Sequence, residues 1–429
     1  MANQRGKGRS TVAVAALCTL ALLQGPGRAG AANGPQPDGP YRYDRLARPV
    51  TGAASAQDGP RLTAGSVYRA ALGPHAKTYF QVALPGLGEA YVSAVAVPGR
   101  DAEVSDGEGI QLSLQDRDGN TCDSSRVAFD PPKYPRPLAA YVTRGLSRSG
   151  TPCQAAGTYY VLVERVGDDA SAKGDWGIEL RHSREPGLAP DEPTAAPTRW
   201  PSASPLPPSG GAHELRGGTG FADAPRTPQG VWRDTLRPGE TRFFRVPVGW
   251  GQQLFATAEL GRSGGGGYVP QALDLQLYNP VLGPVADVYT VYDGKPATTS
   301  FAPLPPVDYR NRFSPSGMVS AMRLGGDYYL AVSVSPELAA KFGPGAYAVT
   351  LRVNVRGQAK AGPSYRQDAP DVTTGATGSP TTGTGAASAT GSGSAGMKAL
   401  AAAGIGTGTL LVLWLGVWTL LARRRALPL

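Results

Sequence analysis

Histidine is scarce in this sequence of 429 residues, and its scarcity excludes the familiar catalytic motifs. The only histidines are His75, His182 and His213, and none belongs to a His-Glu-x-x-His zinc motif. A Gly-x-Ser-x-Gly nucleophile elbow is missing too, since residues 145–149 come nearest and end in serine. A Ser/His/Asp set drawn from distant loops stays open. The sequence favours a protein that is not an enzyme, and it indicates no catalytic residue, metal site or cofactor.

Cysteine is equally scarce, with three residues. Cys18 lies in an apolar run near the N-terminus, and Leu17 before it argues against a lipoprotein site. Cys122 and Cys153 remain, an even pair in what we predict below to be an oxidising exterior. We expect a disulfide that closes a loop of about 30 residues and adds roughly 3 kcal/mol of stability. Two free thiols or metal ligands are the alternative, which would need further Cys or His nearby.

The central part of the chain lacks a strong net charge of either sign. The formal charge is +9, but residues 1–31 and residues 398–429 each hold four basic and no acidic residues. Residues 32–397 therefore carry a formal charge of only +1. A domain without a basic field does not attract polyanions. Nucleic acid is not a predicted partner.

Apolar runs at both ends of the chain predict export and anchoring. Basic residues precede the run at residues 12–23, and Ala29-Gly30-Ala31 follows as a cleavage site, so residues 1–31 read as a secretory signal peptide. Residues 399–422 contain no charge and are long enough to cross a hydrocarbon core of about 30 Å. Three arginines follow at once and predict a cytoplasmic tail, residues 423–429. We predict a single-pass protein of the cell membrane with an extracellular ectodomain.

Proline and glycine are concentrated in two segments of the ectodomain. Residues 183–214 form a proline-rich linker, and residues 357–398 form a stalk rich in Gly, Thr and Ser. They flank residues 32–182 and 215–356, which are rich in Val, Leu, Tyr and Phe and have the size of ordinary domains. We expect the linker to be a semi-rigid polyproline spacer, so that the two domains share little interface.

The two domains are copies of one another. With an offset of 164, Tyr68 to Ala94 match Trp232 to Ala258 without a gap, and Phe80 meets Phe244. Later stretches match in the same order: residues 110–114 with 273–277, and residues 157–160 with 326–329. Order and spacing persist over about 130 residues, which indicates a duplication.

Each copy has the pattern of an all-β domain. Runs of β-branched and aromatic residues at 78–84, 90–97, 110–115 and 159–165 alternate with turn residues, and no stretch sustains a helical period over three turns. We predict about eight short strands per copy and two antiparallel β-sandwich or jelly-roll-like domains, followed by one C-terminal transmembrane helix. The predicted core of the second copy is Trp232, Leu236, Phe244, Val246, Leu275, Leu277, Tyr329 and Leu351.

The opening of the second copy resembles a known bacterial module. Residues 218–225 read Gly-Thr-Gly-Phe-Ala-Asp-Ala-Pro, and residues 230–248 continue with a strand, the turn Pro238-Gly239-Glu240 and the pair Phe243-Phe244. This pattern resembles the pre-peptidase C-terminal (PPC) type of β-sandwich module. Tandem modules of this kind, behind a signal peptide and before a membrane helix, resemble surface proteins of high-GC actinobacteria, some of which also carry von Willebrand A domains.

The resemblance covers most of residues 50–181 and 215–355. The first copy departs from it, since Pro74-His75-Ala76 replaces the Pro-Gly-Glu turn and a predicted disulfide is added. A von Willebrand A domain itself is absent, because Asp123-Ser124-Ser125 has the wrong spacing for its metal motif. The resemblance implies a sandwich and an accessory, non-catalytic role, and it implies no ligand.

Asp116 to Asn120 raise the question of calcium. The segment reads Asp-Arg-Asp-Gly-Asn, with Asp123 close by, but calcium takes six to eight oxygen ligands and few are local. The second copy has Tyr278-Asn279-Pro280 at this place. Because Asp-Gly-Asn between strands is also an ordinary hairpin turn, we favour the turn.

Four aromatic pairs could form a sugar-stacking platform: Tyr79-Phe80, Tyr159-Tyr160, Phe243-Phe244 and Tyr328-Tyr329. Adjacent residues of a strand face opposite ways, so each pair gives one ring to the core and one to the surface. The outward rings either stack on a ligand or cover a neighbouring strand, and the pattern favours the second.

These observations predict a non-catalytic cell-surface protein that displays two β-sandwich binding or scaffolding modules. Its partner would be an unidentified protein or a glycan of the cell envelope. One alternative is an envelope enzyme or an accessory subunit of one. Another is a subunit of a membrane complex assembled through the predicted transmembrane helix, where Gly404 and Gly408 are spaced for close helix packing.

Overall fold

A computed structural model describes residues 41–99, 102–131, 133–145, 153–167, 173–206 and 208–366. Several predictions from the sequence fall outside these residues: the signal peptide with Cys18, most of the stalk, the transmembrane helix with Gly404 and Gly408, and the cytoplasmic tail. None of the helices in the described residues is both long enough and apolar enough to cross a membrane.

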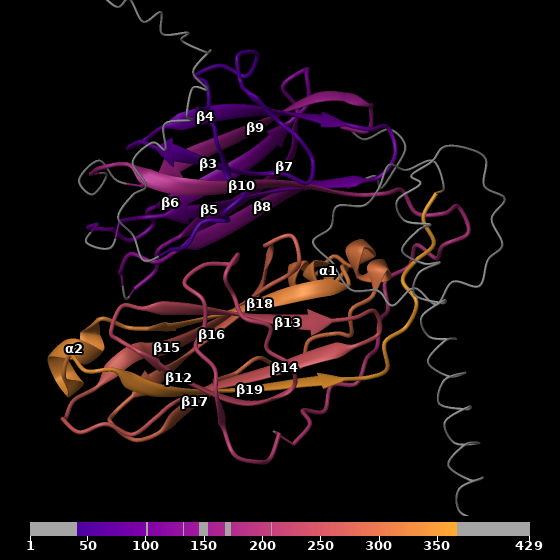
Figure 1. The fold of residues 1–429 in the computed structure, drawn as a ribbon. Coiled ribbons are helices and arrows are strands. Elements are labelled where there is room, and N and C mark those ends of the chain that lie inside the picture. Colours follow the sequence, from indigo (N-terminus) through magenta and orange to yellow (C-terminus); the bar gives the residue numbers. More distant parts are fainter. Residues whose placement is uncertain are drawn as a thin grey trace, which may run out of the picture. The chain divides into compact units, whose positions relative to one another are not determined.

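The first copy forms two five-stranded sheets (Figure 1). Their strands are β1 (Arg48–Pro49), β2 (Arg61–Leu62), β3 (Val67–Leu72), β4 (Lys77–Leu84), β5 (Glu89–Val97), β6 (Gly109–Gln115), β7 (Thr121–Ala128), β8 (Leu138–Arg144), β9 (Gly157–Val166) and β10 (Trp176–Glu185). The strand orders are β1-β3-β10-β5-β8 and β2-β4-β9-β6-β7. Apolar residues of both sheets, such as Phe80 of β4, Ala94 of β5 and Leu180 of β10, share one buried cluster, so the sheets pack face to face as a sandwich.

The second copy is a sandwich of a five-stranded and a four-stranded sheet. Its elements are β11 (His213–Glu214), β12 (Gly230–Leu236), β13 (Thr241–Val248), β14 (Gln253–Leu260), β15 (Val269–Tyr278), β16 (Pro284–Tyr292), β17 (Ala297–Ser300), the 3₁₀ helix η1 (Tyr309–Phe313), α1 (Gly317–Ala321), β18 (Gly326–Val334), α2 (Glu337–Phe342) and β19 (Tyr347–Arg356). The strand orders are β11-β12-β19-β14-β17 and β13-β18-β15-β16.

The two sandwiches have the same strand order, with β3 to β10 matching β12 to β19. The all-β sandwich prediction is therefore confirmed. The predicted core of the second copy is mostly buried in its central cluster. Trp232 only packs against that cluster from its edge, and the Tyr329 prediction is wrong, because this ring lies on the outer face while Tyr328 points inward.

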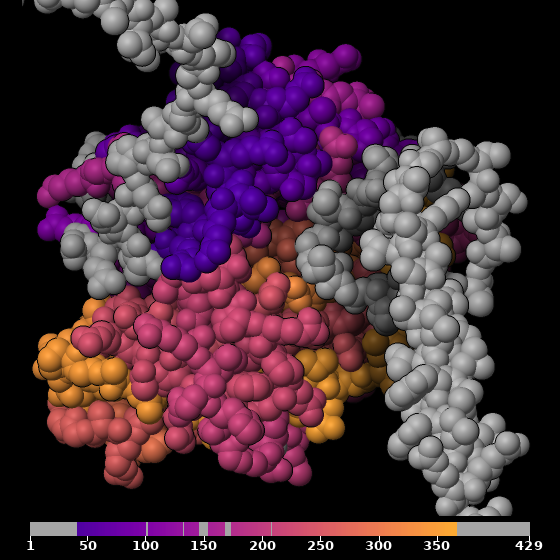
Figure 2. Space-filling view, viewed as in Figure 1, coloured from indigo at the N-terminus to yellow at the C-terminus, as the bar shows by residue number. Residues whose placement is uncertain are grey.

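The two sandwiches also pack against each other within one compact unit of the chain. A buried cluster joins Val95 and Val97 of β5 and Ala139 of β8 to Phe243 of β13 and Tyr329 of β18. Figure 2 shows the indigo and purple surface of the first sandwich meeting the rose and orange surface of the second. The prediction that the domains share little interface is therefore wrong. The outward apolar residues of each sandwich find their partners in the other sandwich, which lies far away in the sequence.

The proline-rich linker packs against the second sandwich rather than acting as a free spacer. Gln253 of β14 donates its side-chain amide to the Pro201 carbonyl at 2.8 Å, and Asn354 of β19 donates to Leu206 at 3.3 Å. Residues 187–189 pair with residues 364–366 through two backbone bonds of 2.9 Å. Because proline leaves carbonyl acceptors without matching N–H donors, side-chain amides of the sandwich can bind the linker directly.

Candidate functional site

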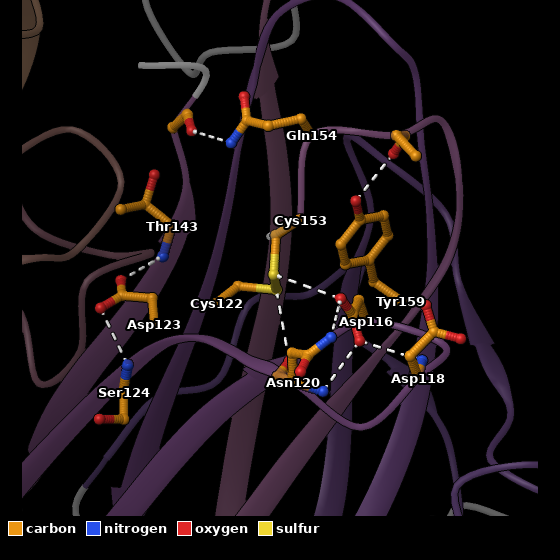
Figure 3. Close-up of a disulfide and its surroundings, with 12 residues drawn as sticks. Asp116, Asp118, Asn120, Cys122, Asp123, Ser124, Thr143, Cys153, Gln154 and Tyr159 are labelled. Atoms are coloured by element: carbon orange, nitrogen blue, oxygen red, sulfur yellow. Dashed lines mark hydrogen bonds between the residues drawn. A yellow bond between two sulfur atoms is a disulfide. The ribbon is translucent and has the colours of Figure 1, made fainter. Parts of the chain in front are cut away.

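Cys122 and Cys153 form a disulfide at the edge of the first sandwich (Figure 3). The Cα atoms lie 5.7 Å apart, a spacing at which a disulfide forms readily. Cys122 belongs to the edge strand β7, and Cys153 lies just before β9 with a left-handed φ of +69°. The bond ties the edge strand β7 to the segment that leads into β9, the central strand of the same sheet. The disulfide predicted from the cysteine count is therefore confirmed.

The segment that raised the question of calcium is the turn between β6 and β7. Asp116 Oδ1 accepts backbone N–H bonds from Asp118 at 3.0 Å and Asn120 at 2.9 Å, and Gly119 takes the left-handed conformation that the turn needs. Asp123 points away from this turn toward β8 and accepts the Thr143 N–H at 2.8 Å (Figure 3). The carboxylates are occupied by the turn and the strand edge, so the hairpin prediction is confirmed.

The three histidines lie apart from one another. His75 occupies a turn after β3, and His213 is exposed on β11, where its ring lies 5.9 Å from that of Trp232. His182 is buried in β10, and its Nδ1 donates to the Leu62 carbonyl at 3.0 Å. Burial lowers its pKa to about 4, so the ring is neutral at pH 7. Across the described ranges, no three His, Cys, Asp or Glu side chains gather into a group that could hold a metal ion.

The aromatic pairs divide their rings between core and surface as the alternation predicts. Phe80, Tyr159, Phe244 and Tyr328 point inward and are buried in the two cores. The outward rings differ between the copies. Tyr79 and Tyr160 of the first sandwich are half-buried, whereas Phe243 and Tyr329 of the second are buried.

In the second sandwich, the outward rings are covered by other aromatic residues and by the first sandwich. The Phe221 ring lies 4.7 Å from Phe243, 5.2 Å from Tyr278 and 5.3 Å from Tyr329. Tyr41, near the start of the described chain, adds an edge-on contact with Phe243 at 6.1 Å. The outer face of β13, β18 and β15 is therefore a docking surface, and its rings serve packing.

The matched face of the first sandwich carries rings and amides but no such cover among the described residues. Phe221 corresponds to Ala56 in the repeat, and Tyr278 corresponds to Gln115. Tyr79 pairs with Leu162 and Gln81 with Tyr160, so Tyr79 and Tyr160 are diagonal neighbours on β4 and β9. Gln111 and Gln115 of β6 are half-buried on the same face, and neither amide has a hydrogen bond to another described residue. The face offers two rings flanked by side-chain amides.

A buried network of charges at the contact between the sandwiches was not predicted. Arg312 of η1 binds Glu185 of β10 at 2.6 Å and Glu89 of β5 at 3.2 Å. Tyr91 lies with its hydroxyl 2.6 Å from Glu89 and 2.8 Å from Glu185, and Arg323 packs over the Tyr91 ring. The four charged side chains are at most 10% exposed. No sequence motif identifies such a network, because its members come from strands and loops far apart in the chain.

The network holds its charges by mutual pairing. Burial alone would raise the pKa of Glu89, but Arg312 and Arg323 hold that pKa below its usual value. Tyr91 shows the opposite behaviour, because burial and the two neighbouring carboxylates raise its pKa well above the usual value. Glu89 stays ionised and the Tyr91 phenol stays protonated, and the pairing of Arg312 with both carboxylates makes the cluster an ionic clamp between the sandwiches.

A cleft of about 730 Å³ opens next to this clamp. Leu87, Leu188 and Phe313 supply apolar walls, and Glu89 and Arg312 of the clamp reach its lining. Both sandwiches and the linker contribute to it. Every polar group of Arg312 is already paired within the clamp, so this guanidinium is not available to a ligand. Glu192 and Arg366 also line the cleft, where Arg366 donates to the Leu188 carbonyl and Glu192 accepts the Ser364 N–H.

Comparison with known proteins gives no family. No protein-family model matches the chain. No curated protein matches it either. Solved structures that match include the triple jelly roll turret protein of an archaeal virus, with 7% identity over 67% of this chain and 54% of that one and a TM-score of 0.17. Others are the CUB1-EGF-CUB2 domain of human MASP-1/3 (6%, 67% and 99%, TM-score 0.16) and the CBM22-1-CBM22-2 tandem domain of Paenibacillus barcinonensis Xyn10C (10%, 66% and 86%, TM-score 0.18).

The viral match spans about half of that protein's length. At TM-scores below 0.2, these likenesses carry no argument about this chain. The resemblance to PPC-type modules stays a prediction from the residues.

Proposed function

We propose that this chain is a non-catalytic protein of the cell surface, held by a single membrane span, whose docked sandwiches bind a glycan of the cell envelope. The signal peptide and the membrane helix predicted from the sequence support the location. The open outer face of β4, β9 and β6 carries the proposal. The matched face of the second sandwich is the one that docks on the first. In the first sandwich, the amides of Gln115 and Gln111 stand where Tyr278 and Asp274 lie in the second.

The chemistry of this face suits a sugar chain. A pyranose ring has a flat C–H face, which stacks on an aromatic ring, and a rim of hydroxyls, which bind amide donors and acceptors. Diagonal neighbours on antiparallel strands lie about 7–8 Å apart, so Tyr79 and Tyr160 can hold successive units of a linear glycan. Gln111 and Gln115 lie beside them for the hydroxyls.

The test is calorimetric titration of the full-length protein in detergent with a β-1,4-linked glucose tetramer, and co-sedimentation with isolated cell envelopes. Tyr79→Ala and Tyr160→Ala should each weaken binding by about tenfold, since each removes one stacking surface. Tyr160→Phe keeps the ring and should retain most of the affinity. A non-catalytic protein should return the tetramer at its original length.

The matched control is Tyr268→Ala, which removes a tyrosine that is 58% exposed on the second sandwich. It should leave glycan binding unchanged. Wild-type affinity in a Tyr79→Ala, Tyr160→Ala double variant would show that the face is not the site. Recovery of shorter sugars would show that the protein hydrolyses the glycan, which would contradict a non-catalytic role.

A further inference from the structure

Strand β16 lies at the edge of its sheet and exposes an apolar corner. Three of the seven large hydrophobic residues that are exposed in the described chain gather here: Tyr268 (58%), Tyr289 (56%) and Val291 (45%). Tyr289 and Val291 lie on β16, and Tyr268 directly precedes β15, its partner strand. Surface hydrophobic residues scattered singly need no explanation, but a cluster on a sheet edge indicates an interaction surface.

The free edge of β16 also presents backbone groups. The Tyr289 carbonyl accepts a bond from Thr299 of β17 at 3.4 Å, so it points away from β15. Since alternate residues of a strand direct their N–H and C=O groups to the same side, Asp287 and Val291 point to this edge as well. Outside the ladder with β15, no backbone–backbone bond of the described chain involves these three residues.

The matched edge of the first sandwich is closed. Strand β7 carries Arg126 and is fixed by the Cys122–Cys153 disulfide. Asp123 ties it to Thr143 of the seven-residue strand β8. Strand β16 has nine residues and no basic side chain, and its neighbour β17 has only four. Charges, covalent ties and covering strands are devices that protect sheet edges, and β16 has fewer of them than β7.

We propose that β16 pairs antiparallel with β16 of a second copy of the chain, which joins the two four-stranded sheets into one. This surface is continuous with the contact between the sandwiches, because β16 approaches β8 of the first sandwich, and Tyr289 pairs with Asp274, which lies near Arg136 of the first sandwich. The inference does not depend on glycan binding, since it uses the other sandwich.

The sequence of β16 is self-complementary in this pairing. With Tyr289 opposite its own copy, Asp287 faces Val291 of the second chain, and no like charges meet. The pairing gives the edge groups of Asp287, Tyr289 and Val291 backbone partners, where the Tyr289 and Val291 carbonyls now accept only long bonds of 3.4 Å from threonine hydroxyls. A two-fold axis through Tyr289 makes the contact closed, so it produces a dimer and no larger assembly.

The test is the mass of the full-length protein in detergent, measured by sedimentation over a concentration series. The wild type should dimerise. Tyr289→Lys combined with Val291→Lys should raise the dimer dissociation constant at least a hundredfold, because four ammonium groups then meet at the edge. The control is Leu46→Lys, which changes an exposed hydrophobic residue of the first sandwich (81% exposed) and should leave the dimer intact.

A second measurement does not depend on the lysine variants. Tyr289→Cys should form a disulfide-linked dimer on mild oxidation, since directly opposed residues lie about 5.5 Å apart, whereas Thr290→Cys, whose side chain points to the opposite face, should not. A monomeric wild type would overturn the proposal. A dimer that survives the lysine variant would also overturn it. The same holds for a dimer that is lost only when Gly404→Leu and Gly408→Leu are introduced.

Discussion

The two copies share a strand order but use the same sheet face for different purposes. In the second copy, the outer face of β13 and β18 is buried under Phe221 and the first sandwich. In the first copy, the matched face of β4 and β9 keeps Tyr79 and Tyr160 half-exposed. The inward rings, Phe80 and Phe244, are equally buried in both. A duplicated core therefore leaves the outward positions free to take up new contacts.

The difference is concentrated at a few positions. Phe221 covers the outward rings of the second copy, and the corresponding Ala56 is too small to do so in the first. The Ala56 carbonyl instead accepts a hydrogen bond from Gln81 at 3.2 Å. One side chain thus separates a docking surface from an open one, although the backbone is the same.

The largest expected effect comes from breaking the clamp between the copies. Arg312→Ala leaves Glu89 and Glu185 buried without their main partner, and the loss of one member of a buried ion pair costs about 3–5 kcal/mol. Urea unfolding of the full-length protein measures this loss. In calorimetry, the wild type should unfold in one transition and the variant in two, because the sandwiches no longer support each other.

Arg352→Ala serves as the control. It removes an ion pair with Glu259 whose members are 25% and 28% exposed, and such pairs are worth less than about 1 kcal/mol. Equal stability of Arg312→Ala and Arg352→Ala would mean that the clamp does not hold the sandwiches together.

The next effect distinguishes the copies by covalent chemistry. Replacing Cys122 and Cys153 by serine should cost about 3 kcal/mol through the greater freedom of the unfolded loop. Hydrogen exchange should show the loss in β6, β7 and β9, while the amides of β15 and β18 keep their protection. Equal losses in both sandwiches would contradict this division.

Acid should affect the two copies in opposite directions. His182 has a folded pKa of about 4, below its unfolded value, so its contribution to stability falls by about 3 kcal/mol as the pH drops from 6.5 to 4. Asp274 has a folded pKa of about 6, raised by burial despite the nearby Arg136, so its contribution rises as the pH drops from 6 to 4.

Unfolding of the full-length protein by urea at pH 4 to 7 tests both statements. The stability of His182→Phe should depend less on acid than that of the wild type, and the stability of Asp274→Asn should fall more steeply on acidification. Variants whose pH profiles are parallel to the wild-type profile would show that neither group responds as its burial predicts.

The smallest effect on stability belongs to a graft of the covering ring. Ala56→Phe places a phenyl group where Phe221 lies in the second copy, and it should reduce glycan binding by about tenfold by covering Tyr79 and Tyr160. The free energy of unfolding should change by no more than about 0.5 kcal/mol, as for most surface substitutions. Ala56→Ser keeps the side chain small and is the control. Unchanged glycan binding by Ala56→Phe would show that the glycan does not bind at this face.

The sequence predicts the strands well because alternation is local. The runs at 78–84, 90–97, 110–115 and 159–165 lie within β4, β5, β6 and β9, and the disulfide follows from the count of cysteines. The match between the copies predicts Tyr329 in the core, but two adjacent rings give no sign of which one points inward. A shift of one residue reverses the face of a strand.

The contact between the sandwiches could not be predicted in this way. The Arg312 and Glu185 side chains are 127 residues apart in sequence, and a charged residue in a loop normally indicates solvent. The outward apolar residues Val95 and Val97 of β5 are the one local signal, because a strand buried on both faces has no polar side. The outer face of β4 gives no such signal, which is why the open face is recognised only beside its covered counterpart.

The position of the linker has a consequence for assembly. The first sandwich offers its β5–β10 face to the β13–β18 face of the second, and a head-to-tail contact of this kind could in principle be extended by further copies. Residues 201–206 bind β14 and β19, the strands that match β5 and β10. The outer face of β14 and β19 is therefore not available to dock a third sandwich in the way that the β5–β10 face docks the second. The proline-rich segment thus covers the surface through which a third sandwich of the same kind would dock.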